Sequence, residues 1–186
     1  MAPLPLPALP FASASDWSEL ARRRPALPRV LAFPVLPLAL LPPLVLYLAG
    51  TLDPARFPPA LARGSWGALA AAFFATEVAT WLALGWLIAC AARSSRVAID
   101  RPTAYLIAAL APVPLWLSSL GLLVADLVVT LGLAGLALAL SCRAVYHGIA
   151  ILGGVRESVT AAWITQIAVG GALIPWVLLD AALLWR

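Results

Sequence analysis

The sequence predicts an all-α integral membrane protein: a bundle of five transmembrane helices with its amino end in the cytoplasm and its carboxyl end outside. Hydrophobic residues make up 63% of the 186 residues and charged residues 11%, against about 25% charged residues in soluble domains. The apolar residues gather in five stretches, and almost all charged residues lie between them. A bilayer is crossed by about 20 residues of helix. Backbone inside lipid must be helical, because no water is there to bond to it.

The five predicted spans follow one another along the chain with short connections. They are Val30–Gly50, Trp66–Ala92, Pro102–Leu117, Leu120–Cys142 and Ala161–Trp185. Prolines in the first and third spans predict bent helices. The uncharged residues 118–121 predict a tight turn that joins the third and fourth spans as a hairpin. For residues 143–160 two alternatives remain open: the fourth span extends beyond the membrane, or a short helix lies in the interface.

The placement of arginine predicts the orientation. All twelve basic residues are arginines, and nine of them fall in the amino-terminal segment and in the second and fourth connections. Basic residues that flank spans stay in the cytoplasm, so these three segments are expected inside. The chain then divides into a cytoplasmic segment, residues 1–29, and a transmembrane domain, residues 30–186. Its net charge of +4 reflects this topology, and no nucleic-acid partner is predicted.

A short helix is predicted just before the first span, over Asp16–Arg24. Its acidic residues come first and Arg22, Arg23 and Arg24 come last, which suits the helix dipole. Trp17 and Leu20 lie three residues apart on one face. One interpretation is a helix lying on the inner membrane surface, with its arginines on anionic lipids. The other is a flanking segment without fixed structure.

Small residues in the second and fourth spans predict close packing of helices. Alanine stands at every fourth position from Ala71 to Ala83, and similar pairs occur at Gly121/Ala125 and Gly135/Ala139. Small side chains at this spacing let a neighbouring helix approach closely.

Two ionisable residues are expected inside the spans, Glu77 near the midplane and Asp126 in the outer third of the fourth span. Such groups are expensive in lipid and are therefore functional candidates. Thr80 and Thr130 follow them on the same helix faces and could hydrogen-bond to them. The functional interpretation is a proton or cation relay. The structural one is that both carboxyl groups are buried and hydrogen-bonded to neighbouring helices.

No catalytic residue, cofactor site or metal site is predicted. The single histidine, His147, has no carboxylate or cysteine beside it, and Cys90 and Cys142 lack the spacing of metal ligands. The familiar nucleotide-binding, hydrolase and metalloprotease motifs do not occur. The favoured function is therefore a non-enzymatic scaffold that binds membrane proteins or forms homo-oligomers. The alternative is a small transporter or channel that uses Glu77 and Asp126.

Three short elements resemble the Yip family of Rab/Ypt-interacting membrane proteins, in a form typical of bacterial members. They are Pro37–Pro42 in the first span, Pro114–Leu117 in the third, and Tyr146–Leu152 (Tyr-His-Gly-Ile-Ala-Ile-Leu) after the fourth. The resemblance covers about 150 residues in arrangement. It departs from the family at Ala150, where proline is usual, and in lacking the long amino-terminal domain of eukaryotic members.

The resemblance implies a fold and a location more than an activity. It implies five spans, an amino end inside, and a multi-pass protein of the bacterial inner membrane. Because the domain tied to Rab partners is missing, GTPase binding is not implied. The lipid-facing and partner-facing candidates are Trp17, the three arginines that follow it, Tyr146 and Gly148.

Overall fold

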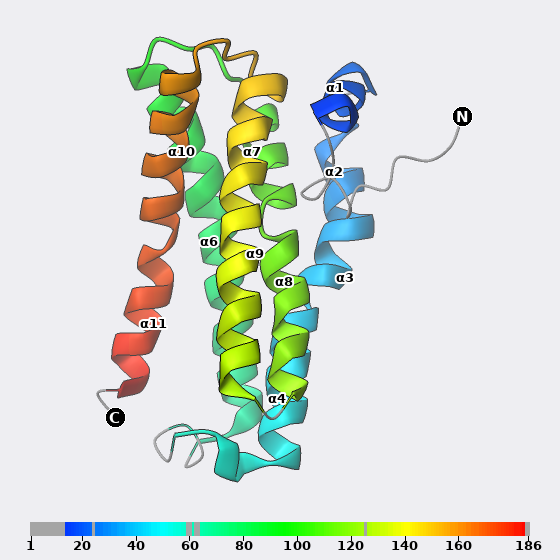
Figure 1. Cartoon of the computed structure of the whole chain (residues 1–186), viewed down its shortest axis with the longest axis vertical. Coiled ribbons are helices and arrows are strands. Elements are labelled where there is room, and N and C mark those ends of the chain that lie inside the picture. The colour runs from blue at the N-terminus through cyan, green and yellow to red at the C-terminus, as the bar shows by residue number, and fades with distance from the viewer. Residues whose placement is uncertain (1–13, 24, 59–60, 62–63, 125, 185–186) are drawn as a thin grey trace.

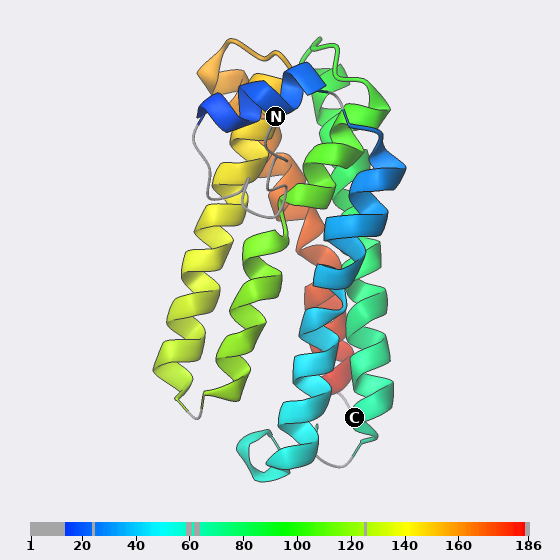
Figure 2. The same ribbon diagram turned by 90° about the vertical axis from the view of Figure 1, so that its right-hand side faces the viewer.

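The computed structural model describes residues 14–23, 25–58, 61, 64–124 and 126–184, and every regular element within them is a helix. Long helices run side by side along one axis, and the short helix α1 (Ala14–Arg23) lies across one end of them (Figures 1 and 2). Within the described part of the chain, four helical segments are long and apolar enough to cross a membrane. The prediction of an all-α chain with several membrane-spanning helices is confirmed for these residues.

The segment that was predicted as the first span is broken. It comprises α2 (Leu27–Val30), the π-helix η2 (Leu31–Val35), α3 (Leu36–Ala39) and α4 (Leu41–Leu52). The two parts, Leu27–Phe33 and Leu36–Leu52, meet at a bend of 45°. Taken together they are long and apolar enough to be a fifth candidate span. The prolines of this region lack backbone N–H groups and clash with the preceding turn, which is the expected cause of such a bend.

The second apolar stretch forms the longest helix, α6 (Trp66–Ser94), and a 3-10 turn, η3 (Pro54–Arg56), precedes it. Ser65 caps α6 by accepting a hydrogen bond from the Ala68 N–H. The third stretch forms α7 (Arg101–Leu110), α8 (Val113–Ser118) and the 3-10 helix η4 (Ser119–Leu123). These three form one apolar segment, Arg101–Leu123, that is long enough to cross a membrane.

The fourth span begins later than the sequence pattern indicates. α9 comprises Leu127–His147 and continues directly into the π-helix η5 (Gly148–Leu152). Of the two alternatives for the connection after Cys142, the structure shows the extended helix, which reaches Leu152. The last apolar stretch forms α10 (Ser158–Ala172) and α11 (Ile174–Leu184), separated by Leu173.

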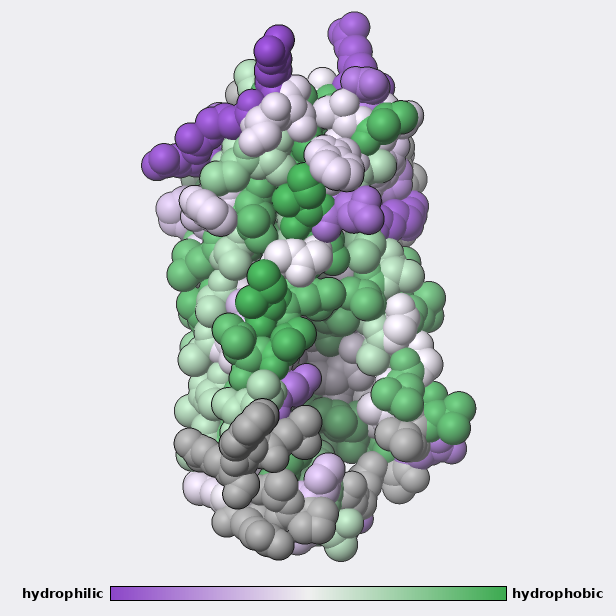
Figure 3. All heavy atoms as spheres, turned by 90° about the vertical axis from the view of Figure 1, so that its left-hand side faces the viewer, coloured by the Kyte–Doolittle hydropathy of each residue, from purple (hydrophilic) through white to green (hydrophobic). Residues whose placement is uncertain are grey.

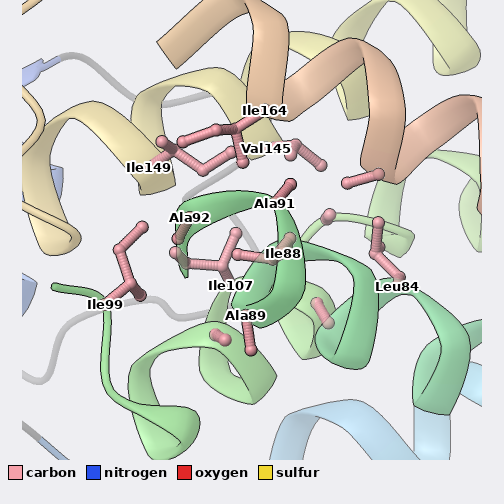
Figure 4. Packing of buried hydrophobic residues seen from close by; sticks show 14 of the residues in the cluster. Leu84, Ile88, Ala89, Ala91, Ala92, Ile99, Ile107, Val145, Ile149 and Ile164 are labelled. Carbon is pink, nitrogen blue, oxygen red and sulfur yellow. The ribbon is translucent and has the colours of Figure 1, made fainter. Parts of the chain in front are cut away.

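The main core lies where α6, α7, η5 and α10 meet. Ile88 and Ala92 of α6, Ile107 of α7, Ile149 of η5 and Ile164 of α10 are all completely buried there, and Figure 4 shows their side chains converging. A second cluster joins α1 and the first, broken span to α7 and α8. Both clusters use residues near the end of the bundle on which α1 lies.

Polar and apolar surfaces are separated along the bundle axis. On the face that Figure 3 shows, hydrophilic side chains gather at the end that carries the α6–α7 and η5–α10 loops, the end on which α1 lies, and apolar side chains cover most of the middle of the bundle. We call this end the arginine-rich end, after its described arginines Arg22, Arg23, Arg93, Arg96, Arg101 and Arg156. At the opposite end lie Asp53, after α4, and Asp126, before α9.

The alanine face of α6 was predicted to pack against a neighbouring helix, but most of it is exposed. Ala71, Ala75 and Ala79 are exposed and contribute to neither core cluster. On α9, a Cβ added to Gly135 would meet nothing within 4 Å. Of the predicted positions, Gly121 is buried and makes a close contact, since a Cβ there would lie 3.1 Å from Leu133 Cδ1. Other close contacts are made by small residues that were not predicted: a Cβ on Gly85 would lie 2.5 Å from the Tyr105 ring. Small-residue spacing therefore located helix faces, but it did not distinguish the packed faces from the exposed ones.

Candidate functional site

The amino-terminal helix predicted over residues 16–24 exists, and it docks on the protein itself. Asp16 lies in the first turn of α1 and Arg22 and Arg23 in its last turn, an arrangement that complements the helix dipole. Trp17 and Leu20 are both only 1% exposed. They belong to the second core cluster, in which Ile151 and Leu152 of η5 are partly buried.

The docking of α1 corrects the prediction for Trp17. A surface helix of this kind was expected to place its indole in the lipid interface, whereas Trp17 is buried in the second core cluster, and α1 packs mainly against η5. The reason is geometric: the end of the bundle offers an apolar surface at the same level, and a helix can bury its one apolar face there. The polar face of α1 remains exposed.

The exposed face of α1 carries a small network of charges. The Glu19 carboxylate accepts hydrogen bonds from the Arg22 guanidinium and from Arg23 Nε, which lies 2.7 Å from Glu19 Oε1. The hydrogen bond from Arg23, with the charge of Arg22, holds the pKa of Glu19 below its usual value. Arg24, the third predicted lipid-facing arginine, lies outside the described residues.

Tyr146 and Gly148, the two candidates after the fourth span, are packing residues. Tyr146 is half-buried against the main core, and its ring stacks edge-on to His147 at a centroid distance of 5.7 Å. Gly148 is buried, and a Cβ on it would lie 2.8 Å from Ile107 Cγ2. Glycine is thus needed at this position because η5 and α7 approach closely, and Gly148 is not available to an outside partner.

A cavity of 450 Å³ lies between α1 and the end of the bundle. It is bordered by the C-terminal half of α1, the start of α2, the start of α7 and the end of η5, with lining residues Leu20, Ala21, Pro25, Ala26, Leu27, Asp100, Pro102, Thr103, Leu106, Ile151, Leu152 and Gly154. Two predicted regions that are far apart in the sequence, the amino-terminal helix and the connection after the fourth span, therefore meet in one place. We take this composite of α1, the start of α7 and η5 as the candidate site.

Glu77 is placed inside a span, as predicted. Its side chain is 8% exposed, on the inward face of α6, and its Oε2 has no hydrogen-bond partner among the described residues. Thr80 does not supply that partner, because its hydroxyl donates to the Thr76 carbonyl at 2.8 Å. The expectation of a carboxyl group hydrogen-bonded to a neighbouring helix is therefore not met at Oε2.

The predicted position of Asp126 is wrong. Asp126 is the exposed N-cap residue of α9, and its Oδ1 accepts from the Val128 and Val129 N–H groups at 2.8 and 3.1 Å. Aspartate is favoured there because the first N–H groups of a helix have no partner within the helix. Thr130 donates to backbone carbonyls of Gly121 and Asp126. Glu77, more than two turns into α6, and Asp126, before the start of α9, do not form one relay.

Three polar residues of interest were missed in the sequence. Ser141 on α9 is buried, and its hydroxyl has no partner in the described part of the chain. Asp180 is exposed on α11 within the candidate span Ser158–Ala182. Asp100 occupies the N-cap position of α7. Asp180 had a signal, a charge within an apolar stretch, whereas the roles of Ser141 and Asp100 depend on neighbours distant in sequence.

Both cysteines, Cys90 and Cys142, are free. Over the described residues, no group of three or more histidine, cysteine, aspartate or glutamate side chains is arranged to hold a metal ion. Comparison with protein-family models, with curated proteins and with solved structures finds no match to this chain.

Proposed function

We propose that the protein crosses the bacterial inner membrane five times, with the arginine-rich end in the cytoplasm. The bent segment Leu27–Leu52 supplies the fifth crossing beside the four long helices. α1 lies at the arginine-rich end, whereas α11 ends at the opposite end, as an odd number of crossings requires (Figure 1). The asymmetry of arginine between the two ends supports this orientation.

The topology is tested with a membrane-impermeant thiol reagent on a chain in which Cys90 and Cys142 are replaced by alanine. Single cysteines are introduced by Ser18→Cys, Arg96→Cys and Gly64→Cys, all at exposed positions. We expect positions 18 and 96 to react from the cytoplasmic side and position 64 from the other side. Labelling of positions 64 and 96 from the same side would contradict the proposal.

We further propose that the protein is a non-enzymatic scaffold whose partner surface is the arginine-rich end. The observation that carries this is the docking of α1: Trp17 and Leu20 hold a charged helix against η5 and α7, so that segments distant in the sequence form one surface. The resemblance of Tyr146–Leu152 to the Yip family supports a role in organising membranes or their proteins.

An affinity purification in mild detergent tests the scaffold role. The full chain is compared with Trp17→Ala, which removes the main anchor of α1, and with Leu131→Ala, whose side chain is 62% exposed on the far half of α9. A set of membrane proteins, or a homo-oligomer, that is recovered with the full chain and with Leu131→Ala but not with Trp17→Ala supports the proposal. Recovery that is the same for all three chains argues against the arginine-rich end as the partner surface.

The second candidate function, a small transporter or channel, is favoured by the unpartnered Oε2 of Glu77. A buried ionisable group without a partner is the feature expected of a proton or cation pathway. Against this role, Glu77 lines neither the cavity under α1 nor the groove between α8 and α9. Proton or cation flux in proteoliposomes that disappears in Glu77→Gln, but persists in Asp126→Asn, would favour transport over the scaffold.

A further inference from the structure

The cavity under α1 lies at the level where the membrane-spanning segments end. Two of these segments are Arg101–Leu123 and Val128–Leu152. The cavity is lined by Pro102 and Thr103 at the start of the first and by Ile151 and Leu152 at the end of the second. In a bilayer, this depth is the boundary between acyl chains and headgroups. A ligand that reaches the cavity from the membrane therefore presents its polar head and the first part of its chains.

The walls of the cavity are mixed in character. Leucine and isoleucine side chains from α1, α2, α7 and η5 form the apolar part, and Asp100 and Thr103 form the polar part. Its volume of 450 Å³ is in the usual range for small-molecule sites, about 300–1,000 Å³. An amphiphile fits this distribution better than a wholly polar or a wholly apolar ligand.

Asp100 differs from the other aspartate at the start of a long helix. Asp126 uses its carboxylate to cap α9, with two hydrogen bonds to backbone N–H groups. Asp100 stands at the same position of α7 but makes no capping hydrogen bond. Neither its carboxylate nor the Thr103 hydroxyl has a partner among the described residues. The cavity is thus bordered by an exposed carboxylate and a half-buried hydroxyl that make no hydrogen bond with the side chains or backbone of the described residues.

A positive charge lies beside this negative one. Arg101, the next residue along the chain, is exposed and likewise has no ion-pair partner among the described residues. The cavity wall therefore offers an acceptor for a cationic group, and the next residue along the chain, which lies outside the cavity lining, offers a donor for an anionic group. Among membrane amphiphiles, a zwitterionic headgroup matches this pair, whereas an anionic headgroup leaves Asp100 without a partner.

We propose that the cavity under α1 binds a phospholipid with an ethanolamine headgroup. The ammonium group donates hydrogen bonds to the Asp100 carboxylate and the Thr103 hydroxyl, and the phosphate faces Arg101. The first methylenes of the acyl chains contact Leu106, Ile151 and Leu152. A choline headgroup carries the same charges but has no N–H to donate, so it should bind less well.

The test is native mass spectrometry of the purified full chain with equal amounts of ethanolamine, choline and glycerol phospholipids of identical acyl chains. We expect the ethanolamine lipid to be retained about three- to tenfold more than either of the others, the range of one net hydrogen bond, because Asp100 is exposed and its bond to the ammonium competes with water. Asp100→Asn should abolish this preference, and Asp126→Asn, the matched N-cap substitution, should leave it unchanged. Equal retention of the three lipids by the unsubstituted chain would overturn the proposal.

Two further arms distinguish the source of the ligand and the role of the cavity. Soluble phosphoethanolamine should not displace the lipid, because it lacks the chains that contact the apolar walls. Displacement at similar concentration would assign the site to a free headgroup compound and overturn the lipid assignment. Ala21→Phe, which fills the cavity from α1, should reduce retention of the ethanolamine lipid, and undiminished retention would place the lipid elsewhere. These outcomes do not depend on whether a protein partner is found.

Discussion

Two apolar segments that look alike in the sequence, α7 and the first half of α9, have opposite environments. From Leu106 to Leu110 every residue of α7 is buried in the protein. From Val128 to Leu136 no described side chain of α9 is buried, and Leu131 is 62% exposed. Over an 18-residue window, 56% of the residues are buried in the span that contains α7, against 22% in the span that contains α9.

The difference in burial between α7 and the first half of α9 indicates what determines helix packing in this bundle. Lipid chains are as apolar as leucine, so hydrophobicity alone does not choose between lipid and protein. α7 is central because small residues let its neighbours approach: Ala104, Ala108 and Ala109 are completely buried, and Gly148 of η5 rests against Ile107. The first half of α9 meets mainly α8 and η4, with which it borders an apolar groove of 360 Å³.

The largest effect is expected at the anchor of α1. Trp17→Ala should remove about 3–5 kcal/mol of packing energy, because the indole is 1% exposed in the second core cluster. We expect α1 to detach, which limited proteolysis of residues 14–23 in detergent would detect. Arg22→Gln with Arg23→Gln should leave α1 protected, since the apolar face holds it. Protection that is lost in the arginine variant but kept in Trp17→Ala would reverse this assignment.

The contrast between α7 and the first half of α9 can be tested directly with one large-to-small substitution in each of the two helices. Ile107→Ala should lower the free energy of unfolding by about 2–5 kcal/mol, because Ile107 is completely buried and alanine leaves a cavity. Leu131→Ala should change it by less than about 1 kcal/mol, because that side chain is exposed. Thermal unfolding in one detergent measures both. Equal losses would mean that α9 packs against a partner in solution.

A small-to-large substitution tests the same contrast at two glycines, one in η5 beside α7 and one in α9. Gly148→Ala should destabilise by about 1–3 kcal/mol, because the new Cβ would lie 2.8 Å from Ile107 Cγ2. Gly132→Ala on α9 meets nothing within 4 Å and should be neutral or stabilising by up to about 1 kcal/mol. Melting temperatures that fall for Gly132→Ala as much as for Gly148→Ala would contradict the contrast between α7 and α9.

The smallest effect concerns pH at the exposed face of α1. The pKa of Glu19 is lower in the folded chain than its usual value, so the ionised carboxylate stabilises α1 at neutral pH. This contribution is present above the unfolded pKa and is lost as the pH falls through the lowered folded pKa. Proteolysis of α1 should therefore increase slightly towards acid pH, and Glu19→Gln should remove that dependence. A dependence that persists in Glu19→Gln would point to another titrating group.

Much of the secondary structure could be predicted from the sequence, and some of the site could not. The apolar stretches predicted the long helices because backbone in lipid has one way to pair its polar groups. The charge order of residues 16–24 predicted a helix there, and α1 (Ala14–Arg23) confirms it for the described residues. The start of α9 was misplaced, because hydropathy does not reveal an N-cap such as Asp126 in an apolar surrounding. The alanine face of α6 was assigned to packing, although Ala71, Ala75 and Ala79 are exposed.

The sequence by itself determined that the chain is a helical membrane protein with its arginines concentrated in particular connections, because hydropathy and charge are properties of local segments. Only the tertiary structure decided that α1 docks on η5, that Gly148 is a contact point, and that Asp100 lines a cavity without capping its helix. These depend on which helices meet. In a membrane, shape complementarity and hydrogen bonding between segments distant in sequence decide which helices meet. Hydrophobicity does not decide it, because an apolar face is as stable against lipid as against another helix.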